Sequence, residues 1–342
     1  MLSVQQLSIE LLVNQKWLTA VRPLSFELKK GEIMGVIGES GSGKSLLAKA
    51  IMNILPKRAR IGGGSLFIND TNVLELSSKE RLKWNGKKIA FIFQNPAAAL
   101  NPIITIGQQL IDAIYAHQKL SKAEAIQIAK QALLDVGIQD AERVFKSYPH
   151  EISGGMKQRA VIAIAVIHQP DLLIADEATT ALDATIRKQV LDLFRMLSQT
   201  KKISILFISH DIAAVKYVAD QVLVLYGGHM LEYGSGQAVL KHAKHPYTED
   251  LLKATPYQVQ AGERLKGIAG QVPPITQNEQ GCIYKDRCKL AHDRCRAFVP
   301  EFRHPALESL HKYKCHLDLF PNTHPLEKEA GESHELVLSA IT

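Results

Sequence analysis

The stretch Gly38-Glu39-Ser40-Gly41-Ser42-Gly43-Lys44-Ser45 decides how the rest of this sequence is interpreted. It fits the pattern G-x-x-x-x-G-K-[ST], which is the phosphate-binding P-loop. The apolar, strand-like run 33–37 precedes it, and the run 46–51, which favours a helix and has no Gly or Pro, follows it. A strand, a glycine-rich loop and a helix in this order form the context that the motif requires.

The residue types of this loop predict its chemistry. Gly41 and Gly43 have no Cβ, so successive backbone N–H groups can point at one spot. The helix that follows adds the positive end of its dipole there. We therefore expect Lys44 to reach the β- and γ-phosphates of a nucleotide and the Ser45 hydroxyl to bind Mg²⁺. The rest of the predicted phosphate pocket is Gly38, Ser40 and Ser42.

Length and composition limit the alternatives. A chain of 342 residues with 46% hydrophobic residues is typical of a soluble protein with one or two domains. No apolar run approaches the roughly 20 residues that a membrane-spanning helix needs. The start, 1–6, lacks the basic and apolar regions of a secretory signal, so we expect a cytoplasmic protein. The net charge of +7 comes without a basic stripe interleaved with aromatic residues, and no nucleic-acid partner is expected.

Two carboxylates end a short apolar strand. The run 172–177 finishes in Asp176 and Glu177. One carboxylate at a strand tip beside a P-loop is the usual ligand of Mg²⁺, and a second can polarise an attacking water as general base. A solvated strand end is the less favoured interpretation, because a P-loop lies upstream.

Two further polar residues follow predicted buried strands. Gln94 comes after the apolar run 89–93, where its amide can lie beside a metal-bound phosphate. His210 comes after the run 203–209. Most single histidines are structural, but open α/β sheets bind ligands at the carboxyl ends of their strands. We therefore expect His210 to act near the γ-phosphate.

The remaining pattern predicts the sheet and the helices. Strands are expected at 3–12 and 23–29, with Trp17 in a loop between them and a break in the chain at the glycines 62–64. Residues 106–146 are expected to be helical. The runs 222–226 and 229–234 suggest a closing hairpin. Alternation of strands and helices predicts a largely parallel sheet covered by helices.

The turn Ser153-Gly154-Gly155 is a second element that suits an anion, because it opens a predicted helix. Such turns are common, and this one is informative only together with the other motifs. Taken in order, the motifs of this chain resemble those of the ATP-binding subunit of an ABC transporter. They are the P-loop, Gln94, this turn, Asp176-Glu177, Asp183 and His210. The resemblance covers residues ~3 to ~235 and is specific as a set.

The resemblance implies a fold, a pairing of two ATPase domains and a role for each motif. The fold would be an α/β ABC-type nucleotide-binding domain over 1–240, with a mostly parallel core sheet, an antiparallel β subdomain and a helical subdomain at about 96–160. Two such domains would face each other, so that each ATP lies between the P-loop of one and the Ser-Gly-Gly turn of the other. The implied roles are metal sensing at Gln94, Mg²⁺ binding at Asp176, catalytic base at Glu177, γ-phosphate contact at His210 and the dimer seam at Asp183.

The C-terminal part of the sequence resembles one group of ABC transporters in particular. Three stretches look like the region that follows the ATPase domain in oligopeptide and dipeptide importers. They are the segment 245–252, Pro273-Pro274 and Gly281-Cys282. This implies a C-terminal extension over 241–325 and a tail over 326–342. It also implies two permeases, a second and paralogous ATPase, and an external peptide-binding protein, with the chain on the cytoplasmic face of the inner membrane. Nickel or other metal chelates and antimicrobial peptides are the alternative cargoes.

Four cysteines, all late in the chain, form a second candidate site. A disulfide framework is not expected in a cytoplasmic protein. The thiolates could hold a [4Fe–4S] cluster, which the resemblance favours, or Zn²⁺, and reduced structural cysteines are the alternative. These residues are Cys282, Cys288, Cys295 and Cys315. The nearby cations would suit an anionic cluster or a solvated face equally well: Lys285, Arg287, Lys289, Arg294 and Arg296.

Three other functions fit the sequence less well. ABC ATPases of DNA repair insert long coiled coils between the halves of the domain, but only about 110 residues separate Lys44 from Ser153, without a long heptad run. Translation-type ABC proteins carry two ATPase domains, whereas this chain has a single P-loop. In a metal-binding regulator the cysteines themselves would be the function.

Overall fold

The computed structural model describes residues 1–180, 182–255, 267–275, 280–305 and 310–317. Within these residues the strands form two sheets, one wholly antiparallel and one mostly parallel. The predicted tail 326–342 lies outside the described residues. None of the helices in the described part combines the length and the apolar character needed to cross a bilayer.

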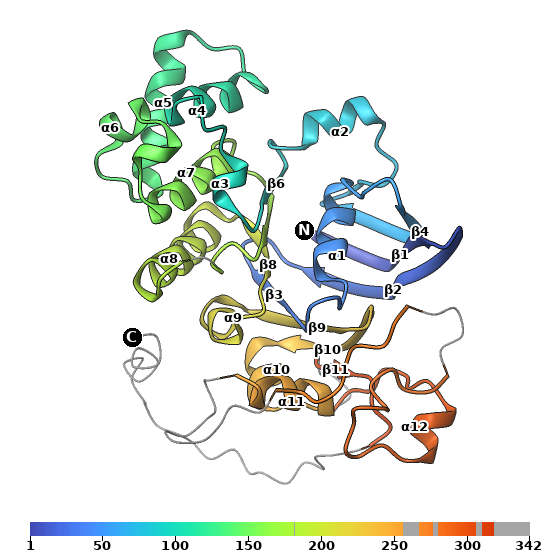
Figure 1. Cartoon of the computed structure of the whole chain (residues 1–342). Coiled ribbons are helices and arrows are strands. Elements are labelled where there is room, and N and C mark those ends of the chain that lie inside the picture. The colour runs from blue at the N-terminus through green and yellow to red at the C-terminus, as the bar shows by residue number, and fades with distance from the viewer. Residues whose placement is uncertain (181, 256–266, 276–279, 306–309, 318–342) are drawn as a thin grey trace.

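The antiparallel sheet forms one side of the molecule (Figure 1). Its strands lie in the order β2-β1-β4-β5. The bounds are β1 Leu2–Val13, β2 Lys16–Leu28, β4 Ala59–Ile68 and β5 Thr71–Asn72. Alternating residues of β1 are buried, as expected for a sheet with one face on the core.

The larger sheet has the strand order β11-β10-β9-β3-β8-β7-β6 in the described chain. The strands from β6 to β9 run parallel, and β10 and β11 are added antiparallel at one edge. Their bounds are β3 Ile33–Ile37, β6 Ile89–Ile92, β7 Leu172–Asp176, β8 Ser204–Ile208, β9 Gln221–Tyr226, β10 His229–Ser235 and β11 Lys312–Tyr313. The predicted parallel core and the hairpin between β9 and β10 are confirmed.

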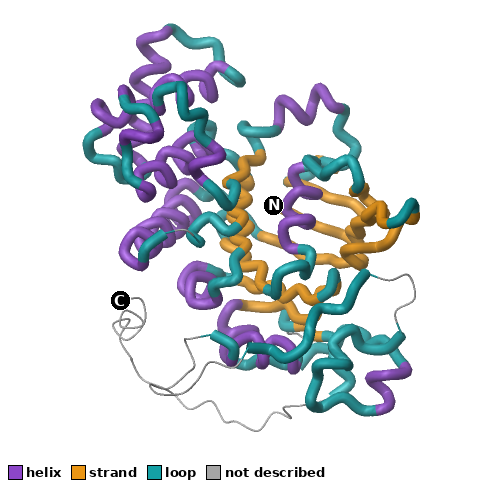
Figure 2. Tube along the Cα trace, in the orientation of Figure 1, coloured by secondary structure: helices purple, strands orange, loops and turns teal. Residues whose placement is uncertain are grey.

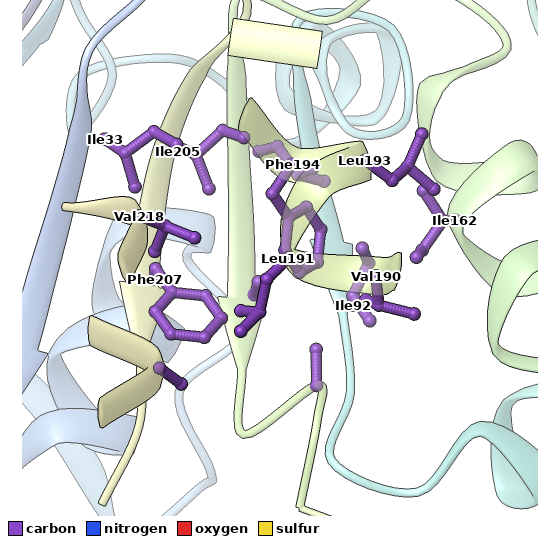
Figure 3. Close-up of a cluster of buried hydrophobic side chains, with 14 of the residues drawn as sticks. Ile33, Ile92, Ile162, Val190, Leu191, Leu193, Phe194, Ile205, Phe207 and Val218 are labelled. Carbon is purple, nitrogen blue, oxygen red and sulfur yellow. The ribbon is translucent and has the colours of Figure 1, made fainter. Parts of the chain in front are cut away.

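Successive residues of the parallel strands enter two different cores. In β8, Ile205 and Phe207 join one cluster, while Leu206 and Ile208 join the other. The strands therefore read as continuous apolar runs, because helices or the second sheet cover both faces. Figure 3 shows the first cluster, where Phe207 faces Leu191 and Phe194 of α8 (Ala184–Lys201).

Helix α1 (Lys44–Met52) fills the space between the two sheets. Its Leu47, Ala48 and Ile51 are buried in the second cluster together with residues of both sheets. Helix α1, which follows the P-loop, is thus held from two sides. The other face of the parallel sheet is covered by α8, by α9 (Ile212–Val218) and by α7 (Gly154–Val166).

A group of helices projects beyond β6 (Figure 2). Several begin at side-chain caps, as Thr105 caps α4 and Ser121 caps α5. Gly137, with φ +81°, follows the end of α5, where a glycine readily takes the left-handed conformation that ends a helix. The bounds of these helices are α3 Pro96–Ala99, α4 Ile106–Tyr115, α5 Lys122–Asp135, α6 Ala141–Lys146 and the 3₁₀ turn Pro149–Glu151. Helix α2 (Ser78–Trp84) comes between β5 and β6 and lies apart from this group (Figure 1).

The C-terminal part packs beside β9 and β10 (Figure 1). Strand β11 pairs with β10, and the fully buried Glu232 carboxylate contacts His311 at 2.7 Å and accepts from the His245 backbone N–H at 3.1 Å. This buried carboxylate joins three separate segments. The helices here are α10 Gly236–Lys241, α11 Pro246–Lys253 and α12 Asp293–Ala297.

Two local predictions are wrong. Trp17 lies in β2, paired with Leu12, and the Arg60 guanidinium carbon lies 4.1 Å from the centre of its ring. The glycines 62–64 do not break the chain but lie inside β4, where the pairing with β1 shifts between Gln5 and Ser8. Glycines in a strand mark such a bulge, because the backbones approach closely there.

Candidate functional site

The P-loop folds as a tight turn between β3 and α1. Gly41 and Gly43 have φ of +78° and +102°, in the region that favours glycine. A Cβ on Gly38 would lie 2.1 Å from the Leu225 carbonyl oxygen, so this position accepts no side chain. The loop thus needs its glycines for backbone shape, and α1 begins at Lys44 with its N-terminus facing the loop.

The Lys44 ammonium lies in the centre of this loop. It donates to the carbonyls of Gly38 at 2.7 Å and Glu39 at 2.9 Å, and its side chain is buried. Burial lowers the pKa of Lys44, and the carboxylates of Glu177, Asp176 and Glu39 oppose this effect. A lysine ammonium in a glycine-rich loop that opens a helix is an arrangement that binds phosphate.

Ser45 and Asp176 meet beside Lys44. The Ser45 hydroxyl donates to Asp176 Oδ1 at 3.2 Å, although 131 residues separate them. Burial raises the pKa of Asp176, and the Ser45 hydrogen bond partly offsets this. Hydroxyl and carboxylate oxygens are hard ligands that fit Mg²⁺, which usually takes one or two protein carboxylates together with phosphate oxygens and water.

Glu177 gathers the polar residues that follow the neighbouring strands. Its carboxylate accepts from Gln94 Nε2 at 2.8 Å and lies 3.3 Å from His210 Nδ1. Its backbone has φ +52°, which is unusual for a residue with a side chain. Its N–H donates to the Ile208 carbonyl at 2.9 Å, which fixes the turn. The structure thus brings together three residues that lie far apart in the sequence.

The Ser153 turn and Asp183 have local contacts. Ser153 caps α7 by accepting from the Met156 N–H at 3.3 Å, and Asp183 caps α8 by accepting from the Ile186 N–H at 3.0 Å. Ser153 and Gly154 are exposed. A Cβ on Gly155 would lie 2.8 Å from Ile186, so this glycine allows close packing of the two helix starts. No hydrogen bond in the described chain joins Ser153 to the P-loop.

A further set of contacts to the P-loop has no counterpart in the sequence motifs. Arg287, expected among the cations of a solvated face or a cluster, is instead buried and forms two hydrogen bonds with the Glu39 carboxylate. The Glu39 N–H donates to the Tyr247 hydroxyl at 2.8 Å. No signal in the sequence points to this, because Glu39 occupies a variable position of the motif.

The four cysteines lie in one neighbourhood. Burial raises the pKa of Cys282 to about 11, and the other three thiols contribute to the rise. Cys295 Sγ lies 3.1 Å from His292 Nδ1. Nevertheless, in the part of the chain that the structure describes, no set of three or more His, Cys, Asp or Glu side chains is placed to hold a metal ion. Neither the expected [4Fe–4S] cluster nor Zn²⁺ is supported by this arrangement.

Comparison with known proteins agrees with this geometry. Residues 21–180 match the family model described as ABC transporter, and residues 231–295 match the model described as oligopeptide/dipeptide transporter, C-terminal region. The dipeptide transport ATP-binding protein DppD of Escherichia coli is 40% identical over 322 residues, which are 93% of this chain and 97% of DppD. DppD of Bacillus subtilis is 42% identical over 84% of this chain and 86% of its own length.

Solved structures share the fold. The ATP-binding cassette MJ0796, in a dimeric post-hydrolysis state bound to ADP and Pi, has a TM-score of 0.61 at 23% identity. The match covers 69% of this chain and 98% of that one. CbiO1 from Clostridium perfringens has a TM-score of 0.62 at 25% identity, over 70% of this chain and 90% of that one. By its identity to DppD over nearly its whole length and by both family models, the chain belongs to the ABC transporter ATPases, in the group with an oligopeptide/dipeptide transporter C-terminal region.

Proposed function

We propose that this chain is the ATP-hydrolysing subunit that powers import of dipeptides or oligopeptides through an ABC transporter at the inner membrane. The observation that carries the ATPase part is the convergence of Gln94 and His210 on Glu177, next to the Asp176–Ser45 pair. The peptide part rests on the relatives, which include dipeptide and oligopeptide transport ATP-binding proteins.

In this proposal the P-loop binds the phosphates of ATP. Lys44 supplies the charge, and the backbone N–H groups of the loop supply the hydrogen bonds. Ser45, Asp176 and Gln94 hold Mg²⁺, which neutralises charge on the phosphates. The full set of phosphate-binding residues is Gly38, Ser40, Gly41, Ser42, Gly43, Lys44 and Ser45.

Glu177 acts as general base on the attacking water. Its carboxylate is held by the Gln94 amide at 2.8 Å and lies 3.3 Å from the His210 ring, so its direction is fixed from two sides. The water attacks the γ-phosphorus in line with the leaving oxygen, and Glu177 takes the proton. His210, more than half exposed, contacts the γ-phosphate.

The site is completed by a second ATPase subunit. Ser153, Gly154 and Gly155 bind the γ-phosphate held by the P-loop of the other subunit, and Asp183 lies at the seam between them. The exposure of Ser153 and Gly154 at the start of a 13-residue helix supports this role. We propose a paralogue as the second subunit, together with two permeases and an external peptide-binding protein.

The proposed domains are an ATPase domain at 1–240, with its helical part at about 96–160, and an extension at 241–325. The chain would bind the permeases on the cytoplasmic face of the membrane. The test is ATP turnover by the assembled transporter in vesicles, with and without the loaded external receptor. Dipeptides or oligopeptides should raise turnover severalfold. Stimulation by a nickel chelate or an antimicrobial peptide alone would favour those cargoes, and turnover indifferent to the permeases would indicate a soluble ATPase.

A [4Fe–4S] cluster on the cysteines stays a separate prediction, with Zn²⁺ as its rival. It is supported by the shared neighbourhood of Cys282, Cys288, Cys295 and Cys315 and not by their present arrangement. Anaerobic purification followed by an absorption scan and metal analysis tests it. Absence of both iron and zinc from freshly purified protein would contradict both metal sites and would indicate reduced structural cysteines.

A further inference from the structure

A buried arginine of the C-terminal part reaches the P-loop. Arg287 Nη1 donates to Glu39 Oε2 at 2.6 Å, and Arg287 Nη2 donates to Glu39 Oε1 at 3.0 Å, across 248 residues of chain. The Arg287 side chain is only 5% exposed, and that of Glu39 is 27% exposed. Two parallel charge-assisted hydrogen bonds fix both the distance and the orientation of the carboxylate.

Three further groups hold the guanidinium in place. Nε donates to the Ala269 carbonyl at 2.8 Å, Nη2 also donates to the Ile268 carbonyl at 3.1 Å, and Nη1 also donates to the Tyr226 hydroxyl at 3.2 Å. These bonds and the two to Glu39 use all five N–H groups of the side chain. A lysine has three donors and no planar fork, so it could not reproduce this pattern.

Glu39 is in turn anchored at several points. Its backbone N–H donates to the Tyr247 hydroxyl of α11 at 2.8 Å, and its carbonyl accepts from the Lys44 ammonium at 2.9 Å. Its carbonyl also accepts from the Ser42 N–H at 3.2 Å. Arg287 and Tyr247 both belong to the C-terminal part, so that part holds the residue whose carbonyl binds Lys44.

We propose that Arg287 is a positioning residue for nucleotide binding, which sets the shape of the P-loop through Glu39. The proposal rests on the proposed role of the P-loop in binding ATP. The side chain of Arg287 donates hydrogen bonds to Glu39, Tyr226 and the backbone of residues 268 and 269, so we expect it to act on the nucleotide through Glu39. When the fork is lost, Glu39 is free to turn, the carbonyls around Lys44 shift, and the phosphate pocket is no longer preformed. The C-terminal region thereby acts on ATP affinity, beyond any role in the assembly of the transporter.

The test compares variants of the full chain in MgATP binding and in turnover. Arg287→Gln and Glu39→Gln should each raise the Kd for MgATP about tenfold, the size expected when a charge-assisted hydrogen bond is lost. The KM for ATP should rise by a similar factor, while kcat at saturating ATP stays within about twofold. The double variant should be no weaker than either single variant, because both remove the same fork. Arg287→Lys should recover less than half of the loss.

Controls separate this role from structural support. Arg294→Gln, at an exposed arginine of the same C-terminal part, should leave the Kd unchanged. Folded variants that bind MgATP within about twofold of the parent would overturn the proposal, and the fork would then be a structural link only. If Arg287→Gln fails to fold, Glu39→Gln decides alone, since it leaves the Tyr247 bond in place. A parent chain that binds MgATP no better than Lys44→Ala would instead refute the proposed function of the P-loop.

Discussion

The carboxylate of Glu177 accepts a hydrogen bond from the Gln94 amide at 2.8 Å, although 83 residues separate them. The register of the parallel sheet explains the contact, because Ile92 pairs with Ala175, and each polar residue stands two positions beyond the strand residue of that pair. Neighbouring parallel strands end at the same edge, so the residues just beyond them converge. The sheet itself therefore assembles the proposed catalytic group.

Glu177→Gln should stop ATP turnover while leaving ATP binding intact. The amide cannot take a proton from water, yet it keeps the size of the side chain and can still bond to Gln94. We expect kcat to fall by about two to four orders of magnitude, the usual contribution of a general base. Steady-state turnover and equilibrium binding of MgATP, measured on the same preparation, check this.

The control for this variant is Asp171→Asn, which removes a carboxylate that pairs with Lys88 at 3.1 Å at the opposite end of β7. Turnover there should stay within about twofold of the parent, because exposed ion pairs contribute little. Near-normal turnover by Glu177→Gln would contradict the base assignment.

Ser45→Ala should weaken the dependence on Mg²⁺ specifically. Its hydroxyl lies 3.2 Å from Asp176 Oδ1, and without it the proposed metal site has one oxygen ligand fewer. We expect the Mg²⁺ concentration for half-maximal turnover to rise about tenfold. Ser45→Thr keeps the hydroxyl and should behave like the parent. A magnesium titration of turnover at fixed ATP distinguishes the two, and equal curves for Ser45→Ala and Ser45→Thr would remove Ser45 from the metal site.

The sequence alone is sufficient to locate motifs that depend on local spacing. The P-loop, the pair Asp176-Glu177 and the turn at Ser153 each combine a short motif with a predictable strand or helix. Gln94 and His210 can be added because parallel strands end at a common edge. Which of their atoms meet Glu177 depends on register, and the sequence does not specify that.

Long-range contacts cannot be predicted in this way. Arg287 lies among Lys285 and Lys289 and has the same appearance in the sequence, yet it is buried against a residue 248 positions away. Trp17 is expected in a loop because turn-forming residues precede it, whereas pairing with β1 keeps it in a strand. In both cases tertiary packing overrides local preference.

Ser153→Arg should block the pocket that this turn is proposed to complete in the second subunit. Ser153 is exposed, so a longer side chain has room within this chain, and in the proposed pair an arginine here would enter the shared pocket. We expect turnover of the assembled pair to fall at least about tenfold, while the P-loop of the variant still binds ATP. Measurement requires the chain together with its second ATPase subunit.

Ser121→Arg is a matched control, because Ser121 is also an exposed helix cap that accepts a backbone hydrogen bond at 3.3 Å. Each substitution loses a cap at a cost of about 1 kcal/mol, so stability should change similarly. Only Ser153→Arg should affect turnover. Normal turnover of the pair that contains Ser153→Arg would refute the shared pocket.

The buried His245 should make the fold sensitive to acid. Its Nδ1 accepts from the Tyr247 N–H at 3.0 Å and caps α11, while its Nε2 is buried without a hydrogen-bond partner in the described chain. Burial lowers the pKa of His245 to about 3 from the usual 6.5. The folded state therefore binds fewer protons than the unfolded state below about pH 6.5, and stability falls progressively as the pH drops toward 3.

His245→Asn should remove this sensitivity, because an asparagine oxygen can still cap the helix but does not titrate. Between about pH 7 and pH 5 the parent should lose about 2 kcal/mol of unfolding free energy that the variant keeps. Thermal unfolding at the two pH values measures the difference as a larger drop in Tm for the parent. His242→Asn, at an exposed histidine three positions earlier, should behave like the parent. Equal drops in Tm for the parent and His245→Asn would mean that His245 is protonated in the folded chain.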